Sequence, residues 1–124
     1  MAGSITSDAL KHRTKNFALM AIRLCQDLPR SQASTVITRQ LLRSSTSVGA
    51  NYRAVCRARS AADFVSKLGI VLEEADETLF WLELLIESGM ARPDKTAPLL
   101  KEANELVSIF VASLRTAKGL KSAI

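Results

Sequence analysis

The sequence is poor in the residues that break helices and in the patterns that build strands. It has five glycines and three prolines in 124 residues, and it contains no alternating run of β-branched and aromatic residues. Leu, Ala, Arg, Glu and Lys, which favour helices, are abundant instead. The sequence therefore predicts an all-α fold, and a half-apolar chain of this length suits one domain over residues 1–124.

Long hydrophobic runs and paired cysteines are also missing. The apolar run around Ala18 to Ile22 is far shorter than the roughly 20 residues that cross a bilayer. No targeting segment is visible. Cys25 and Cys56 form no CxxC pair, which favours reduced thiols as core filler. We expect a cytoplasmic protein that contacts no membrane.

Catalytic residue types are scarce. His12 is the only histidine, and because it lies among basic residues we expect it to be solvated and to bind no metal. Ser44 and Ser45 have no base near them in sequence that would activate a nucleophile. We therefore expect a non-enzymatic protein with no cofactor, no metal and no catalytic residues.

Apolar periodicity places four helices at about residues 7–27, 31–56, 60–88 and 94–118. Pro29 ends the first helix, and Ser60 with Asp63 resembles a capping box at the start of the third. Asp94 or Thr96 is the expected N-cap of the fourth. Short connections favour an antiparallel up-down-up-down four-helix bundle.

The segment 44–50 contains poor helix formers, and propensity alone would make it a loop. The apolar spacing of the second helix nevertheless continues through it. Small side chains allow a neighbouring helix to approach closely. We therefore predict that the segment is helical and packed.

Charge is polarised along the chain. Residues 1–62 hold ten Lys and Arg against two acids, whereas residues 63–124 hold seven against ten. No acid occurs between positions 28 and 62, and on a helical projection four arginines of the second helix share one face. With the next arginine along the chain, the candidate nucleic-acid-binding residues are Arg39, Arg43, Arg53, Arg57 and Arg59. This face is either a solvated surface or a surface for phosphate or a carboxylate-rich partner.

The third helix is apolar on two sides. One stripe suits the bundle core, and the far side carries a second apolar set that one four-helix core cannot bury. We predict that this second set forms a homo-oligomer interface, consisting of Ile70, Phe80, Trp81 and Leu84. The acids of the same helix are expected to pair with arginines, within the bundle or across subunits; on this view the pairing residues are Glu73, Asp76, Glu83 and Glu87.

Six segments of the chain carry a resemblance to known proteins: Arg39 to Ser44, Ser47 to Arg53, Arg57 to Ser60, Asp63 with Phe64, Glu73 to Thr78, and Trp81 to Leu85. In order and spacing, these segments resemble the small four-helix-bundle family first known from proteins encoded in intervening sequences of 23S ribosomal RNA genes. That family includes the accessory variability protein of diversity-generating retroelements. The family often carries an acid shortly after the position of Arg53, where this chain has Ala54 and Val55.

The resemblance implies a cyclic homo-oligomer, with a pentamer as the expected form, and partners that include RNA or DNA and a reverse transcriptase. Three hypotheses follow. The preferred one is a non-enzymatic oligomeric bundle that binds nucleic-acid backbone. An accessory factor to a reverse transcriptase would be one form of this function. The second is a protein–protein assembly adaptor without nucleic-acid binding, and the third, least favoured, is an enzyme.

Overall fold

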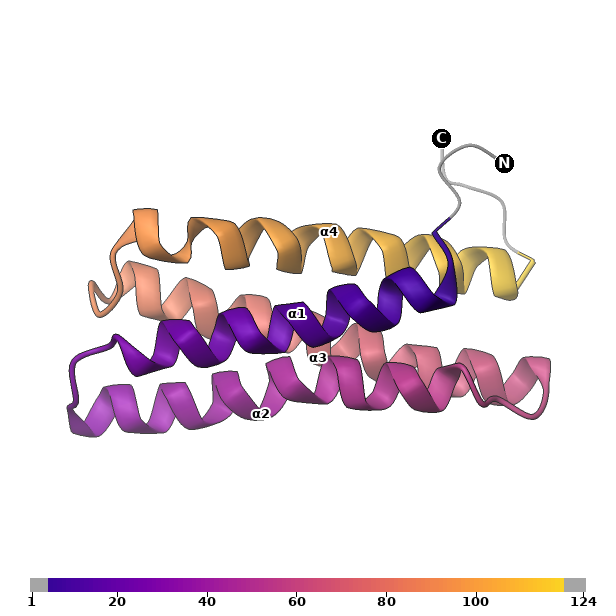
Figure 1. Cartoon of the computed structure of the whole chain (residues 1–124), viewed down its shortest axis with the longest axis horizontal. Coiled ribbons are helices and arrows are strands. Elements are labelled where there is room, and N and C mark those ends of the chain that lie inside the picture. The colour runs from indigo at the N-terminus through magenta and orange to yellow at the C-terminus, as the bar shows by residue number, and fades with distance from the viewer. Residues whose placement is uncertain (1–4, 120–124) are drawn as a thin grey trace.

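The computed structural model describes residues 5–119 and contains four helices and no strand in that range. The helices are α1 (Ser7–Gln26), α2 (Gln32–Val55), α3 (Ala61–Glu87) and α4 (Pro93–Ala117). Figure 1 shows them as one elongated bundle, with the α1–α2 and α3–α4 connections at one end and the α2–α3 connection at the other. The predicted all-α fold with four helices is confirmed, and the helix bounds lie within one residue of the predicted ranges.

Side-chain caps explain where α2 and α3 begin. Ser31 and Ser34 form a reciprocal capping box, in which each hydroxyl accepts a hydrogen bond from the other residue's backbone N–H. The Ser60 hydroxyl accepts from the Asp63 N–H in the same way. The Asp63 carboxylate, however, accepts from the backbone N–H of Arg59, one residue before the cap. That hydrogen bond is the largest cause that lowers the pKa of Asp63.

The N-terminus of α4 differs from the prediction. Neither Asp94 nor Thr96 is the N-cap, because the cap is Arg92 and its side chain makes no capping hydrogen bond. Pro93 occupies the first helical position, where its missing N–H costs no intrahelical bond and its fixed φ suits a helix. Proline geometry therefore starts this helix in place of a polar cap.

The small-residue segment of α2 is helical and packed, as predicted. Ser44 and Ser45 are fully buried, and the Thr78 hydroxyl of α3 donates to the Ser44 hydroxyl at 3.0 Å. On the side toward α1, a Cβ built on Gly49 would lie 3.3 Å from the backbone carbonyl carbon and oxygen of Thr14. Any side chain at this position would push against helix backbone, so glycine sets the distance between α1 and α2.

Two helical glycines provide a matched test of this contact. Gly69→Ala in α3 adds a methyl group to open space, and it should raise the free energy of unfolding by about 0.5–1 kcal/mol through helix propensity. Gly49→Ala should give no such increase, because its methyl group would press on the Thr14 backbone. Gly49→Val should lower the free energy of unfolding by about 1–3 kcal/mol through overpacking. Urea denaturation followed by circular dichroism measures all three variants. Equal gains from the two alanine variants would show that α1 does not press on Gly49.

Candidate nucleic-acid interface

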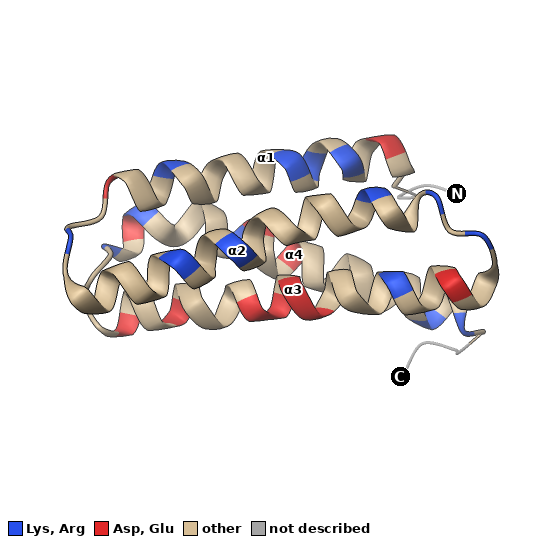
Figure 2. Ribbon diagram, turned by 90° about the horizontal axis from the view of Figure 1, so that it is seen from below, with Lys and Arg blue, Asp and Glu red and all other residues tan. Residues whose placement is uncertain are grey.

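Four of the five predicted arginines form an exposed line along α2 and into the connection that follows it. Arg39 and Arg53 lie on α2, and Arg57 and Arg59 lie between α2 and α3. Figure 2 shows these basic positions along α2 and at its C-terminal end, with no acidic position on that helix. Within residues 5–119, none of the four side chains takes part in a salt bridge. We call these four residues the arginine line.

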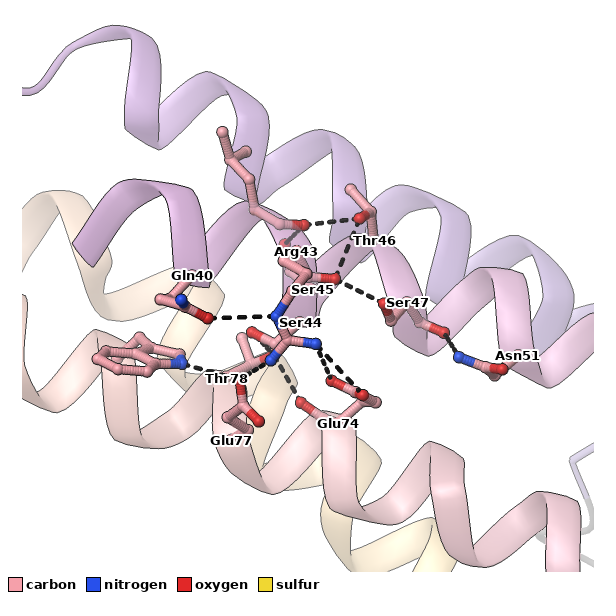
Figure 3. A network of polar contacts seen from close by, with 12 residues as sticks. Gln40, Arg43, Ser44, Ser45, Thr46, Ser47, Asn51, Glu74, Glu77 and Thr78 are labelled. Atoms are coloured by element: carbon pink, nitrogen blue, oxygen red, sulfur yellow. Dashed lines mark hydrogen bonds and ion pairs between the residues drawn. The ribbon is translucent and has the colours of Figure 1, made fainter. Parts of the chain in front are cut away.

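Arg43 lies in a different environment, at the seam between α2 and α3. Its guanidinium pairs with Glu74 at 3.3 Å and with Glu77, and it donates to the Gln40 side chain at 3.2 Å (Figure 3). The hydrogen bond to Glu77 is the main cause that raises the pKa of Arg43. Glu77 also accepts from the indole N–H of Trp81 at 3.1 Å. The charge of Arg43 is therefore balanced by carboxylates of the same chain, unlike the charges of the arginine line.

The acids that pair with α2 are not the predicted ones. We expected Glu73, Asp76, Glu83 and Glu87, and within the bundle that expectation is wrong. All four are exposed, and none forms a salt bridge within the described range. Glu74 and Glu77 take that role because they lie on the side of α3 that faces α2. The helical projection separates faces of one helix, but it does not reveal which face meets a given neighbour.

The Ser44 and Ser45 hydroxyls are hydrogen-bonded, and the Cys25 thiol is protonated. The Ser44 hydroxyl donates to the Leu41 carbonyl, and that of Ser45 donates to the Leu42 carbonyl, as residues inside a helix commonly do. Burial raises the pKa of the Cys25 thiol to about 11, so it is protonated at neutral pH and a poor nucleophile. Among residues 5–119, no group of three or more His, Cys, Asp or Glu side chains is arranged to hold a metal ion.

The predicted interface residues of α3 differ in exposure. Ile70 is 45% exposed and Phe80 is 51% exposed, whereas Trp81 and Leu84 are half-buried. The Phe80 and Trp81 rings meet edge to face with centroids 4.9 Å apart, and Trp81 also packs against the core. The apolar surface available on this face is therefore centred on Ile70 and Phe80.

Sequence reasoning missed an ion-pair cluster between the first and last helices. Arg13 on α1 binds Glu102 on α4 through two hydrogen bonds of 3.0 and 2.6 Å, and it reaches Glu105 at 3.1 Å. The two helices are about ninety residues apart in sequence, so no local pattern indicates this pairing. The cluster holds α1 against α4 near the middle of the bundle.

Comparison with known proteins places this fold in a family. The family model described as 23S rRNA-intervening sequence protein matches residues 9–112. The chain belongs to this family. The matched range of the 23S rRNA-intervening sequence protein family includes the whole arginine line and the α2–α3 seam.

A solved member of the S23 ribosomal protein family has a similar structure. The crystal structure of that protein, from Bacteroides thetaiotaomicron VPI-5482, is 33% identical and superposes with a TM-score of 0.81. The alignment covers 90% of this chain and 99% of the other. That protein is described as being of unknown function. The sequence matches no curated protein. In the part of the chain that the structure describes, no helix has the length and hydropathy needed to span a membrane.

The Arg43 cluster allows a direct test of the α2–α3 seam. Replacing both partners by Gln, in a Glu74→Gln/Glu77→Gln variant, should lower the free energy of unfolding by about 1 kcal/mol, since the pairs are partly exposed. The loss should shrink in 1 M NaCl, where charges are screened over about 3 Å. Urea denaturation at low and high salt measures it. Glu73→Gln, on the same helix without a pair, is the control; an equal effect there would contradict the assignment.

Proposed function

We propose that the protein is a non-enzymatic, cytoplasmic homo-oligomer that binds the phosphate backbone of RNA or DNA through Arg39, Arg53, Arg57 and Arg59. The observation that carries the proposal is the arginine line itself, which is exposed, forms no salt bridge among the described residues and lies in a stretch, residues 28–62, that contains no acid. Guanidinium groups bind phosphate oxygens in bidentate fashion. A solvated surface needs no such segregation of one charge sign.

The spacing of the line suits a polyanion. Arg39 and Arg53 are fourteen residues apart on one helix, which corresponds to about 21 Å along its axis. Arg53, Arg57 and Arg59 concentrate charge where α2 ends. No aromatic side chain of α2 lies on this face, because Tyr52 is buried. The line therefore favours contacts to backbone phosphates over base stacking.

The family relationship supports two further parts of the proposal. By resemblance to the accessory variability protein of diversity-generating retroelements, the nucleic acid would be presented to a reverse transcriptase partner. By the same resemblance, the oligomer would be a cyclic pentamer of up-down-up-down bundles. The exposed Ile70 and Phe80 of α3 support a subunit contact, because an apolar surface rimmed by charge is typical of one.

A second candidate is an assembly adaptor that binds an acidic protein instead of nucleic acid. It rests on the same arginines and on the apolar surface of α3, and it requires no phosphate ligand. Carboxylates bind guanidinium groups as phosphates do. The two candidates are separated by whether a bare polynucleotide is sufficient for binding.

Nucleic-acid binding should depend steeply on salt. The probes are a labelled duplex RNA and a labelled duplex DNA, and the variant is Arg39→Gln/Arg53→Gln/Arg57→Gln/Arg59→Gln. In this variant the slope of log K against log salt should flatten by about 3 to 4, because each lost phosphate contact changes the slope by about 0.9. Fluorescence anisotropy across a salt series measures the slope. Arg115→Gln, an exposed arginine on α4, is the control for net charge. If the native protein binds neither duplex at low salt, the nucleic-acid proposal is wrong and the assembly adaptor becomes the favoured function.

The role of Arg43 can be tested in the same assay. In the Glu74→Gln/Glu77→Gln variant its guanidinium loses both ion pairs, so the slope should steepen by about 1 if the freed side chain reaches a phosphate. Arg43→Gln in the native background should leave the slope nearly unchanged. A large loss from Arg43→Gln alone would show that the native ion pairs open on binding.

The subunit interface should depend on its exposed aromatic ring. Phe80→Glu should dissociate the oligomer without unfolding the chain, because the ring is half exposed in the protomer and a buried unpaired carboxylate would be costly between subunits. Trp81→Ala should also weaken assembly, but with loss of protomer stability, since Trp81 packs on the core. Light scattering gives the mass and circular dichroism the folding; an unchanged mass for Phe80→Glu would exclude this interface.

A further inference from the structure

We propose that the cavity at the end of the bundle where the α1–α2 and α3–α4 connections meet binds an amphipathic organic anion, namely a medium-chain acyl carboxylate. This site is independent of the proposed nucleic-acid function. It lies at the end of the molecule opposite the α2–α3 connection, which carries Arg57 and Arg59 (Figure 1).

The cavity has the size and lining of a small-molecule site. Its volume is about 590 Å³, within the range of about 300–1,000 Å³ that such sites occupy. Leu24 and Leu99 form buried parts of its wall, and Met20, Leu28 and Met90 line it half-exposed. Methionine side chains adapt to the shape of a ligand. The wall therefore fits an apolar body and offers little to a bare inorganic ion.

The fold explains why the space is open. Arg13 ties α1 to α4 through Glu102, and Figure 1 shows the ribbons of α1 and α4 farther apart at the end that carries the α1–α2 connection than at the opposite end. The α3–α4 connection lines the edge of the cavity. Gly89 adopts φ +78°, and the Ala91 N–H donates to the Leu85 carbonyl at 3.0 Å. A helix-ending turn therefore closes the wall without filling the cavity.

The charges at the rim select the sign of the ligand. Three exposed cations, Arg23, Arg92 and Lys95, line the cavity with one exposed acid, Asp27. Arg92 pairs with Asp94 at 3.2 Å, whereas Arg23 and Lys95 form no salt bridge within residues 5–119. A neutral ligand would bury the apolar wall and leave these cations without a partner. A carboxylate on an apolar chain uses both features, because its head can pair at the rim while its chain lies on the wall.

The test compares octanoate with 1-octanol, which has the same chain and no charge. In ¹⁵N-labelled full-length protein, both should shift the backbone amides of Gly89, Met90 and Ala91, and octanoate should bind at least tenfold more tightly. Arg23→Gln/Lys95→Gln should abolish that preference and leave octanol binding unchanged. Lys101→Gln, an exposed lysine on α4 that does not line the cavity, is the charge control.

A second variant tests the location without relying on charge. Met90→Trp places a larger side chain at the wall and should weaken octanoate and octanol together by at least tenfold, with the helical circular dichroism retained. Equal affinity of the native protein for the two ligands, amide shifts scattered over the surface, or an unchanged octanoate affinity in Met90→Trp would each overturn the proposal.

Discussion

The close contact between α1 and α2 at Gly49 is the constraint on which the rest of the bundle depends. With Thr14 backbone 3.3 Å from the place of a Cβ, the two helices are as near as their main chains allow. Ser44 and Ser45 are small, fully buried side chains of α2, and Ser44 contacts Thr78 of α3. Because α2 packs closely on both α1 and α3, its arginines without a salt bridge in the described chain, Arg39 and Arg53, lie exposed on the surface that remains.

The same packing divides the arginines of α2 into two groups. Arg43 lies where α3 approaches, and two carboxylates and a glutamine side chain occupy its donors. The arginine line lies beyond the reach of those acids within the described chain. Chemically identical side chains thus lie in two environments: Arg43 secures the α2–α3 seam, whereas the arginine line, with two members on α2 and two in the connection after it, forms no salt bridge within residues 5–119. Under the proposed function, this division separates the arginine that stabilises the fold from the arginines that bind.

The two candidate sites are separate surfaces of the bundle, and their chemistry suits different anions. The arginine line presents charge on an open convex helix face, which suits a long polyanion whose phosphates recur along its length. The cavity places a few cations at the rim of an apolar wall, which suits a single charge on an apolar body. Membership of the 23S rRNA-intervening sequence protein family accounts for the fold, but the structurally similar member is itself of unknown function. The two sites are therefore argued from their own chemistry.

The sequence by itself determined the four helices and the capped start of α3, because apolar periodicity and the Ser60 hydroxyl act over a few neighbouring positions. It did not determine the start of α4, where the N-cap Arg92 makes no side-chain capping hydrogen bond. It also indicated that the serine-rich segment of α2 packs closely, since only small side chains interrupt an otherwise continuous apolar pattern. Only the tertiary structure decided which charges meet. Glu74 and Glu77 pair with Arg43, and Glu102 pairs with Arg13 across ninety residues of sequence. Such pairs and the end cavity depend on how each helix is rotated against its neighbours, and the packing of all four helices together sets that rotation.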